Sequence, residues 1–572
     1  MRLRILLHFC LLLGLATPLF GQTIRGTLLD GQSKKPLAYA TVFHPASGRG
    51  ALTNADGKFE LKRLQVADSL SISYVGYRTR TVPVRHFSQF DTLLLQPTSY
   101  ELAGATVYAN DDYLYDLVSQ AGRLLDDLNP QTAKSYFQVI TTSGSGQPLE
   151  MVQAYYNATT NKRGLVDLKL KGGRIALAPL SDLYFATLST AQALGMLDLR
   201  HNEYLFPGNP LQYGRAALEQ KFTFTRRADF SNQDLLHLGF EPTTPNGKDF
   251  GGEVWIDGNT YLVHRIILRQ EDVQLHPFLP AWKATEVKRI DLDLDFHFTP
   301  VAGVARLSHI NVQYAANLTH AINTKPGSQI LNMEGILHCY DYGDTFFIPL
   351  FRYNANHNDY RKISFLPFNQ RLWDDQQGLV FTPRQEQQMD FFYRDGWHIN
   401  FDQHARDSSF YPDNNYYWDA KDRIYLPKAA DAMGQDRQGT GGLFSKPDPV
   451  VKFFLDVNPT PDSLSFTSRT VLDVFQSSIN LPKDQFSDCL LNIFFDLCEL
   501  ERRKMMHAIR ASDQQTNTIR QLHAQAEKAV LRLKKSYFRK VKKGTDFAAL
   551  APYNKQVKEA LGINNLALFH DL

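Results

Sequence analysis

The feature that most constrains this 572-residue sequence is a series of short alternating segments near its N-terminus. Between Thr23 and Pro97, apolar and polar residues alternate, and Gly, Pro and Asp-Gly pairs stand where tight turns need them. The expected strands are Ile24–Leu29, Ala40–His44, Gly50–Thr53, Lys58–Leu61, Leu70–Tyr74, Arg78–Val84 and Thr92–Leu95. Seven short strands in a segment of this length are typical of a β-sandwich. The sequence therefore predicts a sandwich domain over residues 22–97.

Four motifs inside this segment carry a family resemblance. In chain order they are Gly26–Asp30, Pro36–Val42, Thr53–Phe59 and Ser71–Tyr77. Their order and spacing closely resemble the carboxypeptidase-regulatory-like domain, a transthyretin-like sandwich. In metallocarboxypeptidases this domain accompanies the catalytic domain and carries no zinc ligand, so the resemblance implies a folding or interaction module.

The segment Glu101–Val107 resembles the stretch that follows this domain in TonB-dependent outer-membrane receptors. About 465 residues remain after it, which is short for a plug together with a large transporter barrel. A TonB-dependent transporter is therefore disfavoured, and the sandwich is expected to precede another kind of module.

The extreme N-terminus has the pattern of a secretory signal. Arg2 and Arg4 precede an apolar run from Ile5 to Phe20, which is too short and too broken to span a bilayer comfortably. We expect residues 1–21 to be removed, so that the mature chain begins near Gln22 or Thr23. The prediction is an exported protein of a Gram-negative envelope, in the periplasm or associated with the outer membrane.

The composition restricts the classes of binding partner and the state of the cysteines, but it identifies no particular partner. A net charge of +3 on 572 residues gives no general attraction to nucleic acid. Without Cys10, which lies in the signal, three cysteines remain: Cys339, Cys489 and Cys498. An oxidising compartment would permit one disulfide, but at least one thiol stays unpaired, and buried unpaired thiols are the favoured interpretation.

The middle of the chain is expected to be a linker and helix over residues 98–130, then a β-rich body over residues 131–400. The helix is predicted at Asp112–Leu128, ended by Asn129 and Pro130. Strands Tyr136–Thr142 and Val152–Asn157 are expected to pair, and a further helix is expected near Leu180–Leu194.

Two later segments give the clearest strand patterns. Two alternating runs within Gly252–Ile266 flank Gly258 and Asn259, which predicts a hairpin with a two-residue loop. The run Ile290–Phe298 also alternates strictly, so its polar members share one face of a strand.

Those polar members are Asp291, Asp293, Asp295 and His297, a set that also suggests a metal site. Side chains two residues apart on a strand lie roughly 6.6–7 Å apart, however, which is far for ligands of one small cation. A solvated outer face is the better interpretation.

The body also resembles an uncharacterised family of envelope proteins that pair the same sandwich with a β-rich body, over roughly residues 112–395. The matching pieces are Asn209–Leu211, Phe240–Pro242, the Gly252–Ile266 hairpin, Asp359–Ile363, Pro367–Asn369 and Leu372–Trp373. Members of that family often end in a membrane β-barrel, whereas the C-terminal segment of this chain is predicted to be helical.

Catalytic motifs are not found in the sequence. It has no His-Glu-x-x-His, no Gly-x-Ser-x-Gly, no phosphate-binding loop and no dinucleotide fingerprint. Asp374, Asp375 and His398 lie among aromatic residues, a neighbourhood that a glycan site could use, but ordinary surface and core are favoured. We therefore predict no catalytic, cofactor-binding or metal-binding residues.

The C-terminal part is expected to be a loop or linker over residues 401–461, followed by a helical region over residues 462–572. Thr467–Ile479 is read as the first helix, and two longer helices follow, each with one apolar stripe. The stripes comprise Phe486, Leu490, Ile493, Leu497 and Leu500, then Ile519, Leu522, Ala526, Val530, Leu533, Tyr537 and Val541.

The second long helix is strongly basic. Between Arg502 and Lys543 there are thirteen Lys and Arg residues against Asp513 and Glu527. Lys534, Lys535, Arg539, Lys540, Lys542 and Lys543 could therefore contact an anionic surface such as lipid headgroups. The favoured alternative is the solvated outer face of a helical bundle.

The predicted fold is thus mainly β with a helical C-terminal region: a seven-stranded sandwich and then a β-rich α+β body. The predicted function is that of a non-enzymatic envelope binding or assembly protein with a protein or glycan partner. One alternative is an envelope hydrolase acting on glycan or peptide, with its site in the middle region. Another is a membrane-associated structural protein in peripheral contact through the basic helices.

Overall fold

The structure, a computed structural model, is mainly β with its long helices at the C-terminus, as predicted. It divides into two compact units, residues 1–345 with 369–398 and residues 346–368 with 399–572. The structure describes residues 22–87, 91–98, 112–126, 129–180, 197–200, 206–227, 235–275, 285–301, 304–322, 325–353, 362–363, 366–367, 369–376, 378–399, 415–426, 447–459, 463–479, 481–482, 484–541 and 547–570. The predicted signal and the helix near Leu180–Leu194 lie outside these residues.

The first unit begins with the predicted sandwich. One sheet has the order β4-β1-β7 and the other has the order β3-β2-β5-β6. Their bounds are β1 Gln22–Asp30, β2 Thr41–His44, β3 Arg49–Leu52, β4 Lys58–Leu64, β5 Ser69–Ser73, β6 Arg80–Pro83 and β7 Asp91–Leu95, with a 3-10 turn η1 at Val84–His86. Leu28, Phe59 and Ile72 are among the fully buried side chains between the sheets. All seven predicted strands are confirmed.

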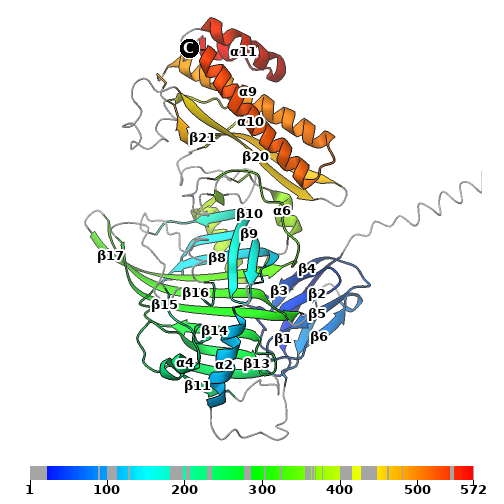
Figure 1. Ribbon diagram of the computed structural model, residues 1–572, viewed down its shortest axis with the longest axis vertical. Helices are drawn as coiled ribbons and strands as arrows, with labels where there is room; N and C mark the ends of the chain where they lie inside the picture. Colours follow the sequence, from blue (N-terminus) through cyan, green and yellow to red (C-terminus); the bar gives the residue numbers. More distant parts are fainter. Residues whose placement is uncertain are drawn as a thin grey trace, which may run out of the picture. The chain divides into compact units, whose positions relative to one another are not determined.

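An antiparallel sheet of eleven strands follows, in the order β11-β12-β13-β14-β15-β16-β17-β8-β9-β10-β18 (Figure 1). The strands are β8 Gln131–Ser143, β9 Pro148–Asn161, β10 Gly164–Leu177, β11 Phe222–Arg226, β12 Leu235–Pro242, β13 Gly251–Asp257, β14 Val263–Gln270, β15 Thr285–Val301, β16 Val304–Ile322, β17 Lys325–Tyr340 and β18 Trp397–Ile399. The other elements of this unit are α2 Asp112–Leu124, η2 Pro210–Gln212, α4 Arg215–Lys221, α6 Gln370–Asp375 and α7 Pro383–Asp395. The expected pairing of the two strands around residue 145 is confirmed by β8 and β9.

One face of this sheet is apolar. Leu292, Leu294 and Phe296 of β15 are buried on it, as strict alternation in a strand requires. Helix α2 lies over this face at the β11 end (Figure 1). There the Tyr115 ring packs against Phe224, with 5.1 Å between centroids. The other face, which we call the polar face, carries the side chains of Asp291, Asp293, Asp295 and His297 and their neighbours.

The hairpin of β13 and β14 corrects one prediction. Its connection runs from Gly258 to Leu262, so the expected two-residue loop is wrong. The Asp257 carboxylate accepts hydrogen bonds from the backbone N–H groups of Asn259 and Thr260, and Tyr261 takes a positive φ of 58°. This side-chain cap stabilises a longer turn than the Gly-Asn pair alone would form.

Within the described residues, the second unit combines a three-stranded sheet, in the order β19-β21-β20, with four helices. Its elements are β19 Asn415–Tyr417, β20 Asp448–Pro459, β21 Leu464–Ser478, α9 Gln485–Ala511, α10 Thr516–Lys540, α11 Phe547–Leu561 and α12 Asn565–His570. Helix α9 packs against β20, β21 and the other three helices. The apolar stripes predicted for α9 and α10 lie in or against the core of this unit, and Phe486 at the start of α9 packs on Phe547.

Two predictions about this unit are wrong. Thr467–Ile479 is not helical: Thr467–Ser478 lies in strand β21, which pairs with β20 from Leu464 to Asp473 and again at Ser478. Its β-branched residues, including Thr470, Val471 and Val474, favour the extended backbone, and strand pairing outweighs the helix-like spacing. The expected loop over residues 401–461 likewise contains β19 and β20.

Cys339, Cys489 and Cys498 are buried free thiols, and burial raises the pKa of each. Helices of the described ranges are either too short or too polar to cross a membrane.

Candidate functional site

The candidate site is an open groove on the polar face, which we call the sheet groove. Four exposed side chains stand side by side across four adjacent strands, because the register pairs Arg269 with Asp293, Asp293 with Gln313, and Gln313 with Glu334. Residues directly opposite each other in antiparallel strands have Cβ atoms about 4.5–5.5 Å apart. The row therefore forms one continuous polar floor.

The sheet groove has a volume of about 880 Å³. Asp291 and Asn332 extend the floor by a second row, and Arg384 at the start of α7 lines its margin. A second hollow of about 360 Å³ shares Gln313, Glu334 and Arg384 with the groove. Loop residues of the sandwich, including Asn54, also line that hollow. The sandwich and the sheet thus border one open surface.

Carboxylates outnumber cations in the sheet groove. Its lining includes five acidic side chains and two guanidinium groups: Glu241, Glu271, Asp291, Asp293, Glu334, Arg269 and Arg384. Partial burial, together with the neighbouring Asp291 and Asp295, raises the pKa of Asp293 despite the nearby Arg269. Such a surface suits a ligand that offers hydroxyl or cationic groups as hydrogen-bond donors.

The sandwich covers an adjoining part of the polar face, around His297 and His309, and we call it the covered region. Here the register aligns His297, His309 and His338 across three strands, with the first two rings stacked at 4.0 Å. The Tyr39 ring of the sandwich lies 6.2 Å from His309. Burial lowers the pKa of all three histidines, so their rings are neutral near pH 7.

A half-buried ion pair lies at the centre of the covered region. Arg265 donates two hydrogen bonds to Asp295, at 2.9 and 2.8 Å, and lies near Tyr74 of the sandwich. Burial raises the pKa of Asp295, but His297 and Arg265 more than offset it and hold that pKa below its ordinary value. The predicted solvated face is therefore wrong for Asp295 and His297, because the sandwich covers them.

The aromatic neighbourhood of residues 372–401 forms part of the packing. Arg63 of the sandwich forms an ion pair with Asp375, and Lys62 Nζ donates to the Asp374 carbonyl at 2.8 Å. Trp373 packs between Tyr155 and Arg174, at 4.9 and 4.1 Å. The side chain of His398 lies outside the described residues. These contacts attach α6 to the sandwich and the sheet.

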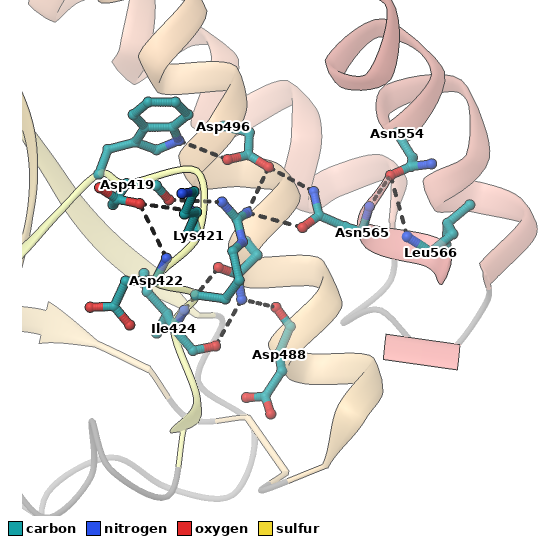
Figure 2. Close-up of polar contacts among 12 residues, drawn as sticks. Asp419, Lys421, Asp422, Ile424, Asp488, Asp496, Asn554, Asn565 and Leu566 are labelled. Carbon is teal, nitrogen blue, oxygen red and sulfur yellow. Dashed lines mark hydrogen bonds and ion pairs between the residues drawn. The ribbon is translucent and has the colours of Figure 1, made fainter. Parts of the chain in front are cut away.

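In the second unit, a buried polar cluster fixes the segment before β20 to the helices (Figure 2). The fully buried Asp496 carboxylate of α9 accepts from Trp418 at 2.8 Å, Arg423 at 2.7 Å and Asn565 at 2.6 Å. Asn492 of the same helix bonds both the backbone N–H and the carbonyl of Ile424. Because its partners lie on separate segments, this cluster is architectural.

The predicted anionic-surface residues are only partly brought together. Lys534 forms an ion pair with Asp448, whereas Lys535, Arg539 and Lys540 are exposed on α10. Lys542 and Lys543 lie outside the described residues. A shared anionic surface for this set stays a prediction, and salt-dependent binding to anionic vesicles would test it.

Sequence reasoning found two members of the sheet groove, Asp291 and Asp293, and missed its other residues. The alternation of Asn311, Val312, Gln313 and Tyr314 in β16 carries the same signal as β15. Alternation assigns a residue to a face, but it does not give the register that aligns Gln313 with Asp293. Within the described ranges, no group of three or more His, Cys, Asp or Glu side chains could hold a metal ion.

Comparisons with known proteins identify the N-terminal domain. Residues 24–108 match the CarboxypepD_reg-like domain, so the chain carries such a domain at its N-terminus, as its motifs predicted. The match reaches eleven residues beyond the predicted boundary at residue 97. No curated protein matches the chain.

Among solved structures, the chain is similar to the Pseudomonas aeruginosa MucA/MucB complex, at 11% identity over 40% of this chain and 93% of that chain, with a TM-score of 0.13. It is also similar to a DUF1329 family protein from Desulfovibrio piger, at 11% over 40% and 93%, with a TM-score of 0.16. A LolA superfamily protein, NE2245 from Nitrosomonas europaea, matches at 10% over 39% and 91%, with a TM-score of 0.16. At these TM-scores the likenesses carry no conclusion about fold or function.

Proposed function

We propose that this protein is an exported, non-enzymatic binding or assembly component of a Gram-negative envelope, and that its sheet groove holds a protein or glycan partner. The carrying observation is the groove itself, an open polar surface on four strands of the eleven-stranded sheet. The CarboxypepD_reg-like domain beside it supports the proposal, since the resemblance implies an interaction module.

Rigid strands suit this role. Strands hold the floor residues in fixed positions, so a partner meets preorganised hydrogen-bonding groups and less conformational freedom is lost on binding. The excess of carboxylates favours a partner segment rich in hydroxyl groups or cations over an acidic one.

Site-specific photo-crosslinking in intact cells tests the proposal. A photoreactive residue at Gln313, on the groove floor, should capture one defined envelope partner. The same residue at Lys169, which is exposed on β10, should not capture it. Glu334→Lys should abolish capture from Gln313, because it reverses one charge of the floor without removing a buried group.

Equal capture from Gln313 and Lys169, or capture unaffected by Glu334→Lys, would remove the groove from the binding surface. Turnover of a glycan or peptide by the purified full chain, lost in Asp293→Asn, would favour the hydrolase alternative instead.

Export has its own test. Because residues 1–21 read as a cleavable signal, mass spectrometry of protein isolated from cells should find an N-terminus at Gln22 or Thr23. Retention of Met1 would contradict both the signal and the envelope location.

A further inference from the structure

A second groove, in the C-terminal unit, has the opposite charge. It lies between α9 and the first half of β21 and has a volume of about 640 Å³. We call it the arginine groove, because Arg469 of β21 and Arg502, Arg503 and Arg510 of α9 line it. None of these residues belongs to the basic set predicted on α10.

The fold brings these arginines together from two segments more than thirty residues apart in sequence. Residues seven or eight apart in a helix lie on the same side of it, two turns from each other. Arg502 and Arg503 lie eight and seven residues before Arg510, so all three project from one side of α9. Strand β21 runs along that side and adds Arg469. Strand β19 pairs with β21 at Val471–Asp473, beside the groove, and the ring of Trp418, directly after β19, lies 5.4 Å from the Arg503 guanidinium.

One carboxylate offsets part of this charge. Glu499 accepts hydrogen bonds from Arg502 at 2.6 and 2.8 Å, from Arg503 at 2.9 Å and from Thr470 at 2.7 Å. These contacts hold two guanidinium groups in place and saturate the carboxylate. Within the described ranges, Arg469 and Arg510 have no acidic partner, so the groove keeps an excess of positive charge.

The hydroxyl of Ser468 points independently to a ligand. Ser468 is 8% exposed and lines the groove, and in the described part of the chain its Oγ atom has no hydrogen-bond partner. The neighbouring hydroxyl on the same face, that of Thr470, is bonded to Glu499. A buried hydroxyl without a partner is costly in free energy, and a turn of its χ1 rotamer toward the groove would let an oxygen-rich ligand satisfy it.

We propose that the arginine groove binds a phosphate group. Guanidinium groups match phosphate oxygens in geometry and form paired, charge-assisted hydrogen bonds with them. Arg469 and Arg510 supply uncompensated charge, Arg502 and Arg503 are held in position by Glu499, and Ser468 supplies a hydroxyl. Donors that converge from a strand and a helix suit the several oxygens of a phosphate better than the two of a carboxylate.

Calorimetric titration of the full chain with inorganic phosphate tests this site. Arg469→Gln with Arg510→Gln should weaken binding by about tenfold or more, because two charge-assisted contacts are lost. Both side chains are exposed, so the melting temperature should stay nearly unchanged. The matched control is Lys555→Gln with Lys558→Gln, which removes two exposed cations from α11 and should leave the affinity within about twofold.

Ser468→Ala separates binding from structure. Because its hydroxyl has no partner among the described residues, the substitution should not lower the melting temperature, yet it should weaken phosphate binding about threefold. Unchanged affinity in this variant would exclude the hydroxyl from the site. Equal losses in the arginine and lysine double variants would show only non-specific charge and would overturn the proposal, as would no binding by the wild type.

The source of the phosphate is distinguished with vesicles. Phosphatidylcholine vesicles that contain phosphatidylglycerol should bind the wild type and not the arginine double variant if the group belongs to a lipid. Binding of inorganic phosphate without vesicle binding would support a soluble or glycan-borne phosphate. This site lies apart from the sheet groove in sequence, so either proposal can fail alone.

Discussion

The covered region and the sheet groove occupy the same face of the same sheet, yet their polar side chains do different things. In the covered region, Asp295 pairs with Arg265 and His297, and His297 stacks on His309 beneath the sandwich. In the sheet groove, Asp293, Gln313 and Glu334 stay exposed. The strands, the alternation and the residue types are alike, so enclosure by another domain decides whether a polar residue is architectural or available to a ligand.

The largest expected difference between the regions concerns their carboxylates. Asp295→Ala would leave Arg265 enclosed without its partner, and we expect a loss of about 3 kcal/mol in the free energy of unfolding. Asp291→Ala breaks a more exposed pair with Arg289 and should cost at most about 1 kcal/mol. Urea unfolding of the two variants measures both. Equal losses of unfolding free energy in the two variants would show that coverage by the sandwich does not make the carboxylates of the two regions differ.

The sandwich that covers the region depends on a tight turn. Gly57 has φ of +75°, and a Cβ atom there would lie 2.4 Å from the Leu28 carbonyl oxygen. Gly48 has φ of +71° but nothing within 4 Å of such an atom, so it is a matched control. We expect Gly57→Ala to cost about 1–3 kcal/mol more than Gly48→Ala. Faster hydrogen exchange of the His309 amide in Gly57→Ala alone would show that the sandwich protects the covered region.

The covered region should also respond to pH. Burial lowers the pKa of His338 to about 3, so below about 6.5 the unfolded chain binds a proton that the folded chain excludes. The contribution of His338 to the free energy of unfolding is therefore fully present above pH 6.5. It falls, by up to about 1.4 kcal/mol per pH unit, as the pH drops toward 3. His338→Gln should flatten the dependence of unfolding free energy on pH between 6 and 4. Identical slopes would mean that the ring is accessible to protons in the folded state.

The smallest effect is expected in the sheet groove. The raised pKa of Asp293 means that the folded state disfavours its charge, so Asp293→Asn should change stability by no more than about 0.5 kcal/mol at pH 7, toward greater stability. The stability of the wild type should rise relative to that of the variant as the pH falls toward the pKa of Asp293, because protonation removes the charge that the folded state disfavours. A large loss on substitution would place Asp293 among the architectural residues.

The sequence predicted what depends on local periodicity. The seven sandwich strands and the Asp-Gly turns between them were predictable, because turn residues and alternation act over a few neighbours. It also placed the apolar stripes of α9 and α10, since helical spacing repeats along one segment. It misread Thr467–Ile479, where pairing with a strand some fifteen residues earlier in the chain decided the backbone.

By itself, the sequence determined which side chains of β15 share a face, because side chains alternate in any extended strand. Only the tertiary structure decided which of these side chains remain exposed to solvent. Asp293 joins Gln313 and Glu334 through the register of β16 and β17, whereas Asp295 lies near His309, on which Tyr39, over two hundred positions away, packs from the sandwich. The arginine groove has the same origin: Arg469 and Arg510 meet because β21 and α9 pack together. Periodicity is a property of a segment, whereas coverage and convergence depend on contacts between distant segments.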